Sequence, residues 1–386
     1  MKTDFVIAGG GIAGMLATLV LAHSGARVVC VDPAPSDAPP DLRSTAFLMP
    51  AIRLLSRVGV FAALEPAATP LRIMRIVEAA DGSINQTADF SSAEAGEDQF
   101  GWNIPNAALR RILPGAIDAH PHADLRRGLT VEGHTPRLND TIVRLSNSET
   151  IVSRLLIAAD GRDSQLRQAA GIATRRFHYG QKALVFTVSH DQPHDGISTE
   201  IHMSGGPFTL VPLAGNDQRR SAVVWMDTGP NIATLQAMDE TGFEARLNTR
   251  ACGVMGALRL DSPRAAWPII AQYAQRLSAP RLALIGETAH VVPPIGAQGL
   301  NMSLADISAL ADLAATTNDP GAPQLLDRYH RTRWPNMRLR VQGIDALNRA
   351  SMARNPLAQA VRDAALKTLS TVSPLRKAAI TAGLGR

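Results

Sequence analysis

A run of glycines near the N-terminus has the spacing of a phosphate-binding turn. Residues 9–14 read Gly-Gly-Gly-Ile-Ala-Gly, a G-x-G-x-x-G pattern that directly follows the apolar segment Phe5–Ala8. In this pattern the first glycine permits a sharp turn, the second lets a pyrophosphate approach the backbone, and the third lets a helix pack close to the strand. The helix N-terminus supplies N–H donors and the positive end of its dipole. We therefore predict a strand, a nucleotide-binding turn and a helix over about residues 12–24.

An acidic residue lies where a ribose would be bound. Asp32 comes at the end of the next predicted strand, Arg27–Val31. A carboxylate there can accept hydrogen bonds from both hydroxyls of an adenosine ribose, and it would repel a 2′-phosphate. The tightly bound nucleotide is therefore predicted to be FAD or NAD, and not NADP.

The same N-terminal segment is uncharged over residues 5–22, as a signal peptide or a membrane span would be. However, three consecutive glycines interrupt it, Asp4 offsets Lys2, and a strand follows in place of a polar mature start. We expect a core strand and helix, and hence a cytoplasmic protein, or one that is peripheral at the inner face of the membrane.

Two later loops also place an acid after an apolar run. The apolar residues 155–159 are followed by Asp160-Gly161, and a helix is predicted to begin near Ser164. Taken alone, this is an Asp-Gly turn with a serine helix cap. Residues 282–302 run from a strand through Gly286-Glu287 into a proline-stiffened loop and a second helix. Acids at the carboxyl ends of strands lie where α/β sheets bind their ligands.

The three loops, in this order and spacing, resemble the FAD-dependent aromatic hydroxylases of the p-hydroxybenzoate hydroxylase type. The resemblance covers roughly residues 1–345. Within that superfamily, the sequence is most similar to the ubiquinone-biosynthesis hydroxylases. Further segments that carry the resemblance are Asp41-x-Arg43, Trp102–Asn106, Tyr179–Ala183 and Gly206–Leu213.

The resemblance implies a set of cofactor contacts and two co-substrates. FAD would be the bound cofactor, NADPH or NADH the transient reductant, and O2 the oxidant. The ADP half of FAD would be held by Gly9, Gly11, Ile12, Ala13, Gly14 and Asp32, with flanking contacts from Arg43 and Asn106; Asp160 and Gly161 would serve both FAD and the nicotinamide, Glu287 would bind the ribityl chain, and Gly296, Gln298, Gly299, Leu300 and Asn301 would lie along the isoalloxazine.

Two positions depart from the family pattern. Glu287 stands where the family usually has Asp, so its extra methylene shifts the ribityl contact or routes it through water. In the last helix of the flavin domain, the usual Tyr…Arg-x-x-Asp pattern ends in Asn336, after Tyr329 and Arg333. An asparagine cannot pair with an arginine as an anion.

No catalytic base stands out. His290, in the third loop, could polarise a group near the flavin, or it could simply tie the loop together. Pro293 is a candidate neighbour of the flavin and the substrate. His190 and His194 flank Pro193, which argues against a shared helix face. With two cysteines, the chain offers neither a disulfide framework nor a Cys-rich metal site, and we expect no metal.

Composition and length favour a globular enzyme. The 386 residues are 45% hydrophobic and 19% charged, which allows a sizeable core in two to three domains. Aromatic residues make up only 4%, which does not favour nucleic-acid binding by base stacking. We predict an α/β (α+β) fold with a Rossmann-like FAD-binding domain (residues 1–72, 101–178 and 273–345), an inserted antiparallel-sheet substrate domain (73–100 and 179–272) and a helical, basic C-terminal segment (346–386).

The substrate domain and the C-terminal segment leave alternatives open. Phe208, Leu210 and Pro212 could face a ring pocket or belong to ordinary sheet core. From Arg328 to Arg386 the chain has 12 Lys and Arg against two acids. Such an end can bind an anionic membrane surface or other ubiquinone-biosynthesis proteins. It can equally pack on the flavin domain or on the second subunit of a homodimer, or form a buried arginine network.

The predicted function is an FAD-dependent monooxygenase (hydroxylase) that acts on the aromatic ring of a polyprenylated phenol in ubiquinone biosynthesis. One alternative is a hydroxylase of a small soluble aromatic acid, and another is a flavin reductase or dehydrogenase. A third is a non-catalytic FAD-binding member of a biosynthetic complex. The basic, apolar C-terminal segment favours the lipidic substrate, and the intact glycines argue against a non-catalytic protein.

Overall fold

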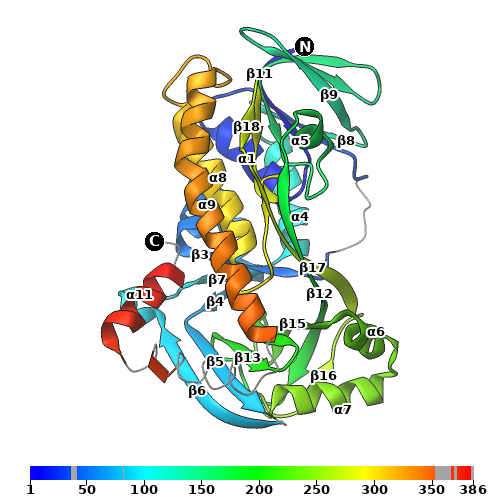
Figure 1. Cartoon of the computed structure of the whole chain (residues 1–386), viewed down its shortest axis with the longest axis vertical. Helices are drawn as coiled ribbons and strands as arrows, with labels where there is room; N and C mark the ends of the chain where they lie inside the picture. Colours follow the sequence, from blue (N-terminus) through cyan, green and yellow to red (C-terminus); the bar gives the residue numbers. More distant parts are fainter. Residues whose placement is uncertain (36–40, 81, 353–366, 369–371, 384–386) are drawn as a thin grey trace.

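The computed structural model describes residues 1–35, 41–80, 82–352, 367–368 and 372–383. The described residues form a mixed α/β structure with three sheets, and the long helix α9 runs down one side of the molecule with the shorter α8 beside it (Figure 1). The helices are α1 (Ile12–His23), α2 (Met49–Arg57), α3 (Phe61–Leu64), α4 (Asn106–Asp118), α5 (Gln165–Ala169), α6 (Gly229–Ala237), α7 (Glu240–Ala251), α8 (Gln298–Ala314), α9 (Pro323–Met352) and α11 (Ser373–Gly383), with short 3-10 turns η1 (Glu65–Ala67), η2 (Ser92–Ala95) and η3 (Gly286–Thr288).

The first sheet contains the predicted nucleotide-binding strands. It has eight strands, with the path β18 (Ser278–Ala279), β19 (Leu282–Leu284), β11 (Thr150–Ala158), β1 (Lys2–Ala8), β2 (Val28–Asp32) and β8 (Ala123–Arg127), and the hairpin β9 (Val131–Pro136) and β10 (Thr141–Leu145) extends from β11. The run from β19 to β8 is parallel. Parallel strands are covered on both faces and need nearly continuous apolar runs, which β1 and β2 supply. The predicted strand, turn and helix at the N-terminus are confirmed.

Because β1, β2, β11 and β19 run in the same direction, the loops after them lie at one edge of the sheet. The glycine turn, Asp32, Asp160 and Gly286 all follow the carboxyl ends of these strands. Segments separated by more than 250 residues in the sequence are thus brought to one place. This arrangement is what the three loops led us to expect.

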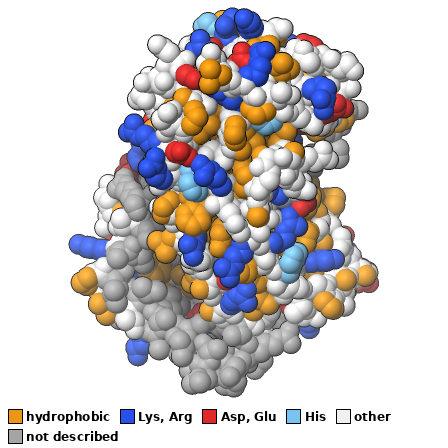
Figure 2. All heavy atoms as spheres, turned by 45° about the horizontal axis from the view of Figure 1, so that its top comes forward, with side chains coloured by type: hydrophobic (Ala, Val, Ile, Leu, Met, Phe, Trp, Pro, Cys, Tyr) orange, Lys and Arg blue, Asp and Glu red, His pale blue; other side chains and the backbone are white. Residues whose placement is uncertain are grey.

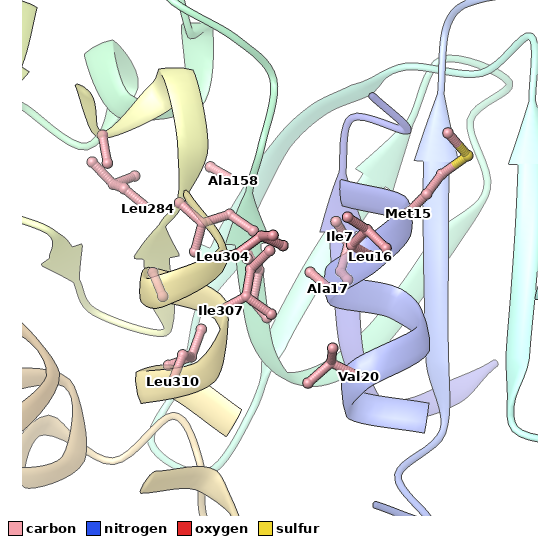
Figure 3. Close-up of a cluster of buried hydrophobic side chains, with 14 of the residues drawn as sticks. Ile7, Met15, Leu16, Ala17, Val20, Ala158, Leu284, Leu304, Ile307 and Leu310 are labelled. Carbon is pink, nitrogen blue, oxygen red and sulfur yellow. The ribbon is translucent and has the colours of Figure 1, made fainter. Parts of the chain in front are cut away.

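Helices α1 and α8 pack beside each other over this sheet. Figure 3 shows Leu304 and Ile307 of α8 pointing toward α1, whose Leu16 and Ala17 face them. All four side chains are buried. Helix α9 then packs on α8, and the Tyr329 hydroxyl donates a hydrogen bond of 2.8 Å to the carbonyl of Leu284 at the end of β19. Helices α8 and α9 therefore both hold the third loop in place, α8 by packing on η3 and α9 through the hydrogen bond of Tyr329.

The second sheet is the predicted substrate sheet. Its path is β20 (His290–Val291), β17 (Ala265–Ala274), β12 (Thr174–His190), β15 (Arg220–Thr228), β14 (Gly206–Pro212), β13 (Ile197–Met203), β5 (Ile73–Ala80) and β6 (Ser83–Ser91), with β16 (Leu258–Leu260) paired to β12. Alternating residues in the sequence predict strands over 183–189, 199–203, 208–212 and 222–226, and β12, β13, β14 and β15 confirm them. The expectation of a wholly antiparallel sheet is wrong at one place, because β13 and β5 pair in parallel. Strand β13 is antiparallel to its other neighbour, β14, so the parallel pairing is confined to β13 and β5.

A small third sheet and two long strands connect the halves. The third sheet has the order β3 (Ser44–Leu48), β7 (Gly101–Pro105) and β4 (Thr69–Leu71). Strands β12 and β17 run past the predicted domain limits at 178 and 272, so backbone pairing continues across these limits. The division into domains stays a prediction from the sequence.

The C-terminal helix α11 packs on the edge of the substrate sheet (Figure 1). Ile380 is buried with Phe90 and Phe100, and Arg376 pairs with Glu94. Part of the predicted segment, including Leu357, Val361 and Leu369, lies outside the described residues. Among the described residues, no helix combines the length and apolar character needed to cross a bilayer. Basic side chains are scattered among hydrophobic patches on the face shown in Figure 2.

We predict that Tyr329→Phe destabilises the fold. The Tyr329 side chain is fully buried, and the change leaves the Leu284 carbonyl without its hydrogen bond. The expected loss is about 1–3 kcal/mol of unfolding free energy, measured by denaturant titration. Tyr273→Phe is the matched control, because the described residues offer its hydroxyl no hydrogen bond. Equal losses in the two variants would contradict the prediction.

Candidate active site

A cavity of about 630 Å³ lies between the loop edge of the first sheet and one face of the second. The predicted site residues that line it are Gly11, Ile12, Ala13, Gly14, Arg43, Asn106, Gly161, Glu287, His290, Pro293, Gly296, Gln298, Gly299 and Leu300. Four others are not part of its lining: Gly9, Asp32, Asp160 and Asn301. The structure therefore collects most of the predicted residues around one space.

The glycine turn fits a close ligand. A Cβ on Gly14 would lie 1.8 Å from the carbonyl oxygen of Gly9, and one on Gly9, whose φ is +106°, would lie 2.3 Å from that of Ala159. At Gly9 and Gly14 a side chain would therefore collide with the backbone of the protein, whether or not a ligand is bound. A Cβ on Gly11 would meet no atom within 4 Å. Since Gly11 lines the cavity, this open space suits a pyrophosphate against the backbone, as the resemblance implies.

Asp32 lies against the same turn. Its Oδ1 accepts a hydrogen bond of 3.0 Å from the backbone N–H of Ala34, and a Cβ on Gly10 would come within 2.5 Å of its Oδ2. The carboxylate is thus held at the carboxyl end of β2 beside the predicted pyrophosphate position. This placement fits the predicted contact with the adenosine ribose.

The second and third loops are joined by Thr288. The hydroxyl of Thr288 lies 3.1 Å from Oδ1 of Asp160 and accepts a 3.1 Å hydrogen bond from the backbone N–H of Gly161. Ser164 caps the short helix α5 by accepting from the N–H of Arg167. The predicted helix cap at Ser164 is therefore confirmed, and the second loop also contacts the third loop through Thr288.

A carboxylate network positions Arg43 and Asn106 in the cavity. Arg43 makes two hydrogen bonds to Asp41, of 2.8 and 2.7 Å, and Asn106 donates to the same carboxylate at 3.0 Å. Burial alone would raise the pKa of Asp41, but the hydrogen bonds from Arg43 and Asn106 outweigh it and lower the pKa to about 2. The Arg43 guanidinium also lies 5.0 Å from the ring centre of Trp267.

Glu287 has an arginine partner from the second loop. Its carboxylate lies 3.1 Å from Nε of Arg162, and the side chain is about half exposed. Both residues line the cavity. The longer side chain at this position therefore forms a bridge between two loops, and its contact with the ribityl chain stays a prediction.

The side-chain amides of Asn301 and Gln298 form hydrogen bonds within the protein. The amide of Asn301 accepts from the N–H of Leu48 and donates to the carbonyls of Ala46 and Ala297. Gln298 donates to the carbonyl of Gly296 and accepts from Arg340. These contacts fix the start of α8 against β3, so that its first-turn N–H groups are presented at the cavity.

His290 ties the third loop to the two long helices. Its Nε2 lies 2.7 Å from Oδ2 of Asp306, whose other oxygen accepts a 2.9 Å hydrogen bond from Arg333. All three are buried. These contacts match the tying role. A catalytic role for His290 stays a prediction, as does contact of Pro293 with the flavin and substrate. Because Arg333 pairs with Asp306, it does not need an acid at position 336, and Asn336 accepts instead from Arg340.

The wall opposite the loops is one face of the substrate sheet. Of the two alternatives for Phe208 and Leu210, the structure shows ordinary sheet core, because both are buried under α6 and α7. Side chains alternate along a strand, so their neighbours Thr209 and Val211 line the cavity instead. Sheet residues in the lining include Met74, Ala183, Val185, Ser198, Glu200, Thr209, Val211, Ala222, Val223, Val224, Trp267, Pro268, Ile269 and Ile270.

Several functional residues were missed from the sequence. Thr288 and Glu200 carry no local signal that separates them from other polar residues. Asp306 does carry one, since it lies four residues after Met302 and four before Leu310 on the apolar side of α8. An acid in that row predicts a buried ion pair. Among the described residues, no group of His, Cys, Asp and Glu could hold a metal ion.

These features define a flavoprotein of the aromatic hydroxylase type, and the comparisons agree. The family model described as FAD binding domain matches residues 2–343, so the chain belongs to that family. It is an FAD-dependent aromatic-ring monooxygenase by family and fold.

Similar proteins cover nearly the whole chain. Ubiquinone hydroxylase UbiL of Rhodospirillum rubrum is 33% identical over 354 residues, which are 90% of this chain and 81% of that protein. The 3-demethoxyubiquinol 3-hydroxylase of Escherichia coli is 28% identical over 99% of this chain and 98% of its own length. Among solved structures, p-nitrophenol 4-monooxygenase PnpA from Pseudomonas putida has the same fold, with a TM-score of 0.81, 17% identity, and coverage of 99% of this chain and 98% of its own.

Gly11→Ala should weaken FAD binding without destabilising the apoprotein. The added methyl group meets no protein atom but fills the space proposed for the pyrophosphate. We expect the Kd for FAD to rise roughly tenfold or more, which fluorescence titration of the apoprotein would measure. Gly14→Ala is the matched control and should lower the unfolding free energy itself, since its methyl group collides with Gly9. An unchanged FAD Kd in Gly11→Ala would contradict this assignment.

Asp41→Asn should remove part of the acid sensitivity of the fold. The pKa of Asp41 lies at about 2 in the folded chain against an ordinary 3.8, so its ionised form stabilises the fold above about pH 4. That stabilisation is lost as the pH falls from about 4 to about 2, and amounts to about 2 kcal/mol. Denaturant unfolding between pH 2 and pH 5 would show a flatter slope for the variant. Asp140→Asn, at an exposed ion pair, is the control, and equal slopes in wild type and Asp41→Asn would contradict the prediction.

Proposed function

We propose that the chain uses FAD, NAD(P)H and O2 to hydroxylate the aromatic ring of a polyprenylated phenol in ubiquinone biosynthesis. The observation that carries this proposal is the shared cavity, in which the three cofactor loops face a largely apolar sheet wall. The ubiquinone hydroxylases among its relatives support the choice of pathway.

The residues in the cavity fit FAD and suggest how each part would act. Gly11 and the α1 N-terminus would hold the pyrophosphate, Asp32 the ribose, and the first turn of α8 a negative charge on the reduced ring. When bound, FAD supplies the electrons from NAD(P)H and the electrophilic oxygen from O2. The task of the chain is to orient the phenol ring and to keep water away from it.

The charge of the sheet wall favours a neutral phenol over an aromatic acid. Among the described lining residues of the substrate sheet there is no Lys or Arg, and the one charged side chain is the acid Glu200. A substrate carboxylate on this wall would lack a cation and would be repelled by Glu200. The lining cations Arg43, Arg110 and Arg162 lie on the loop side. The first two pair with Asp41, and Arg162 pairs with Glu287. An aromatic acid is therefore the poorer fit.

Association with partners stays a prediction from the sequence. A membrane surface or other biosynthetic proteins would be contacted through the basic C-terminal segment, and a homodimer is the alternative use of that segment. Arg333 and Arg376 from the basic region form ion pairs inside the chain, which accounts for part of its charge. Contacts with nucleic acid are not expected.

The test begins with the visible spectrum of the purified chain before and after anaerobic NADPH or NADH. We expect flavin bands that bleach, and then, in ¹⁸O2, a hydroxylated prenylphenol that carries the label. A small aromatic acid such as 4-hydroxybenzoate should stimulate NAD(P)H oxidation far less. Preference for the acid would move the proposal to a soluble substrate. Flavin that is reduced but gives no labelled product would indicate a reductase, and no flavin after reconstitution would favour a non-catalytic role.

A further inference from the structure

Glu200 is a carboxylate on the substrate wall of the cavity. It lies on β13 next to Thr209 of β14 and Ile76 of β5, with Val224 one strand further. Ser198 precedes it on the same face of the strand and also lines the cavity. These four neighbours on the sheet are uncharged, and nothing in the cofactor loops requires an acid here.

The other titratable groups of the cavity are committed elsewhere. Asp41 and Glu287 are paired with Arg43 and Arg162, and the pairing lowers the pKa of Asp41, which makes it a weaker proton acceptor. His290 is bound to the buried Asp306. Glu200 differs from them, because it has no arginine or lysine partner among the described residues.

One oxygen of Glu200 is held by a histidine. Nε2 of His202 lies 2.8 Å from Oε1 of Glu200, and both side chains are less than one-fifth exposed. The two residues are two apart on one strand and so share a face. For Oε2 of Glu200 the described residues provide no hydrogen-bond partner, which leaves this oxygen for a group in the cavity.

We propose that Glu200 is the general base that takes the phenolic proton of the substrate during hydroxylation, and that His202 positions its carboxylate. This inference rests on the proposed function. As the ring carbon forms a bond to the electrophilic oxygen, the bond between that oxygen and its donor breaks, and the donor keeps the electron pair. In the same step the substrate O–H bond breaks and the proton moves to Oε2 of Glu200. The electron pair of that bond enters the ring and makes the attacking carbon more nucleophilic. The proton passes to water when the product leaves.

Other charged groups face this site. The loop side of the cavity contributes Asp41, Arg43, Arg110, Arg162, Glu287 and His290. On the sheet, Glu78 of β5 lies beside His202 in register. None of the cavity cations is on the strands that flank Glu200.

The test compares Glu200→Gln with Ser198→Ala, a control on the same strand and cavity face. For Glu200→Gln we expect product formation to fall roughly 100-fold at neutral pH and the acid limb of the kcat profile to disappear. A fluorinated prenylphenol, which ionises more readily, should restore much of the loss because it needs no base. Ser198→Ala should keep the wild-type pH profile. His202→Gln should shift the acid limb while Glu200 still acts.

The outcomes separate this inference from the proposed function. Labelled product from the wild type, together with a Glu200→Gln variant whose pH profile and response to fluorination are unchanged, would overturn the role of Glu200 alone. No labelled product from the wild type would overturn the proposed function and this role with it. If Glu200→Gln does not fold, Glu200→Asp provides the test, because it keeps the carboxylate but draws it back by one methylene. If product formation by Glu200→Asp falls tenfold or less, and the fluorinated substrate does not restore it, the result would count against the base role.

Discussion

Parallel pairing of β1, β2, β11 and β19 is the constraint on which the active site depends. The register of β1 with β11 and of β11 with β19 brings the glycine turn, Asp160 and Glu287 to one edge. Each loop is then held by contacts with the next, through Thr288 and through the pair of Glu287 with Arg162. The long helices fasten this edge from behind by way of Asp306 and Tyr329. A shift of any of these strands would separate residues that act together.

Much of this edge could be predicted from the sequence because the signals are local. A glycine that cannot carry a side chain, an apolar run and an acid after a strand are all read within about 30 residues. The cofactor loops were found in this way, and the resemblance then related them to one another. The same holds for the strands of the substrate sheet, where alternation predicted β12 to β15. It left open which face of β14 would line the cavity, and only the packing of α6 and α7 on Phe208 assigns that face to Thr209.

The rest depends on contacts between distant segments, which local patterns do not carry. Asp306 pairs with His290 and Arg333 only because α8 and α9 pack on the third loop. The parallel pairing of β13 with β5 joins segments more than 100 residues apart. Glu200 can be singled out as the proposed base only when the structure shows that Asp41 and Glu287 are already paired with arginines. The role of Asn336 likewise changes once Arg333 is seen with another carboxylate.

The continuity of β12 and β17 across both halves affects how such an enzyme can change its substrate. The third cofactor loop enters the substrate sheet directly, since His290 and Val291 form β20 and pair with β17. The spacing between the third loop and the wall of the substrate sheet is therefore set by backbone hydrogen bonds, which side-chain replacement leaves in place. Positions such as Thr209, Val211 and Val224 can vary in size and polarity without moving the reacting centres apart. In such a scaffold, side chains of the sheet wall determine which aromatic ring binds, while the backbone pairing of β20 with β17 holds the cofactor loop. Substrate specificity can therefore change while the geometry of oxygen transfer is kept.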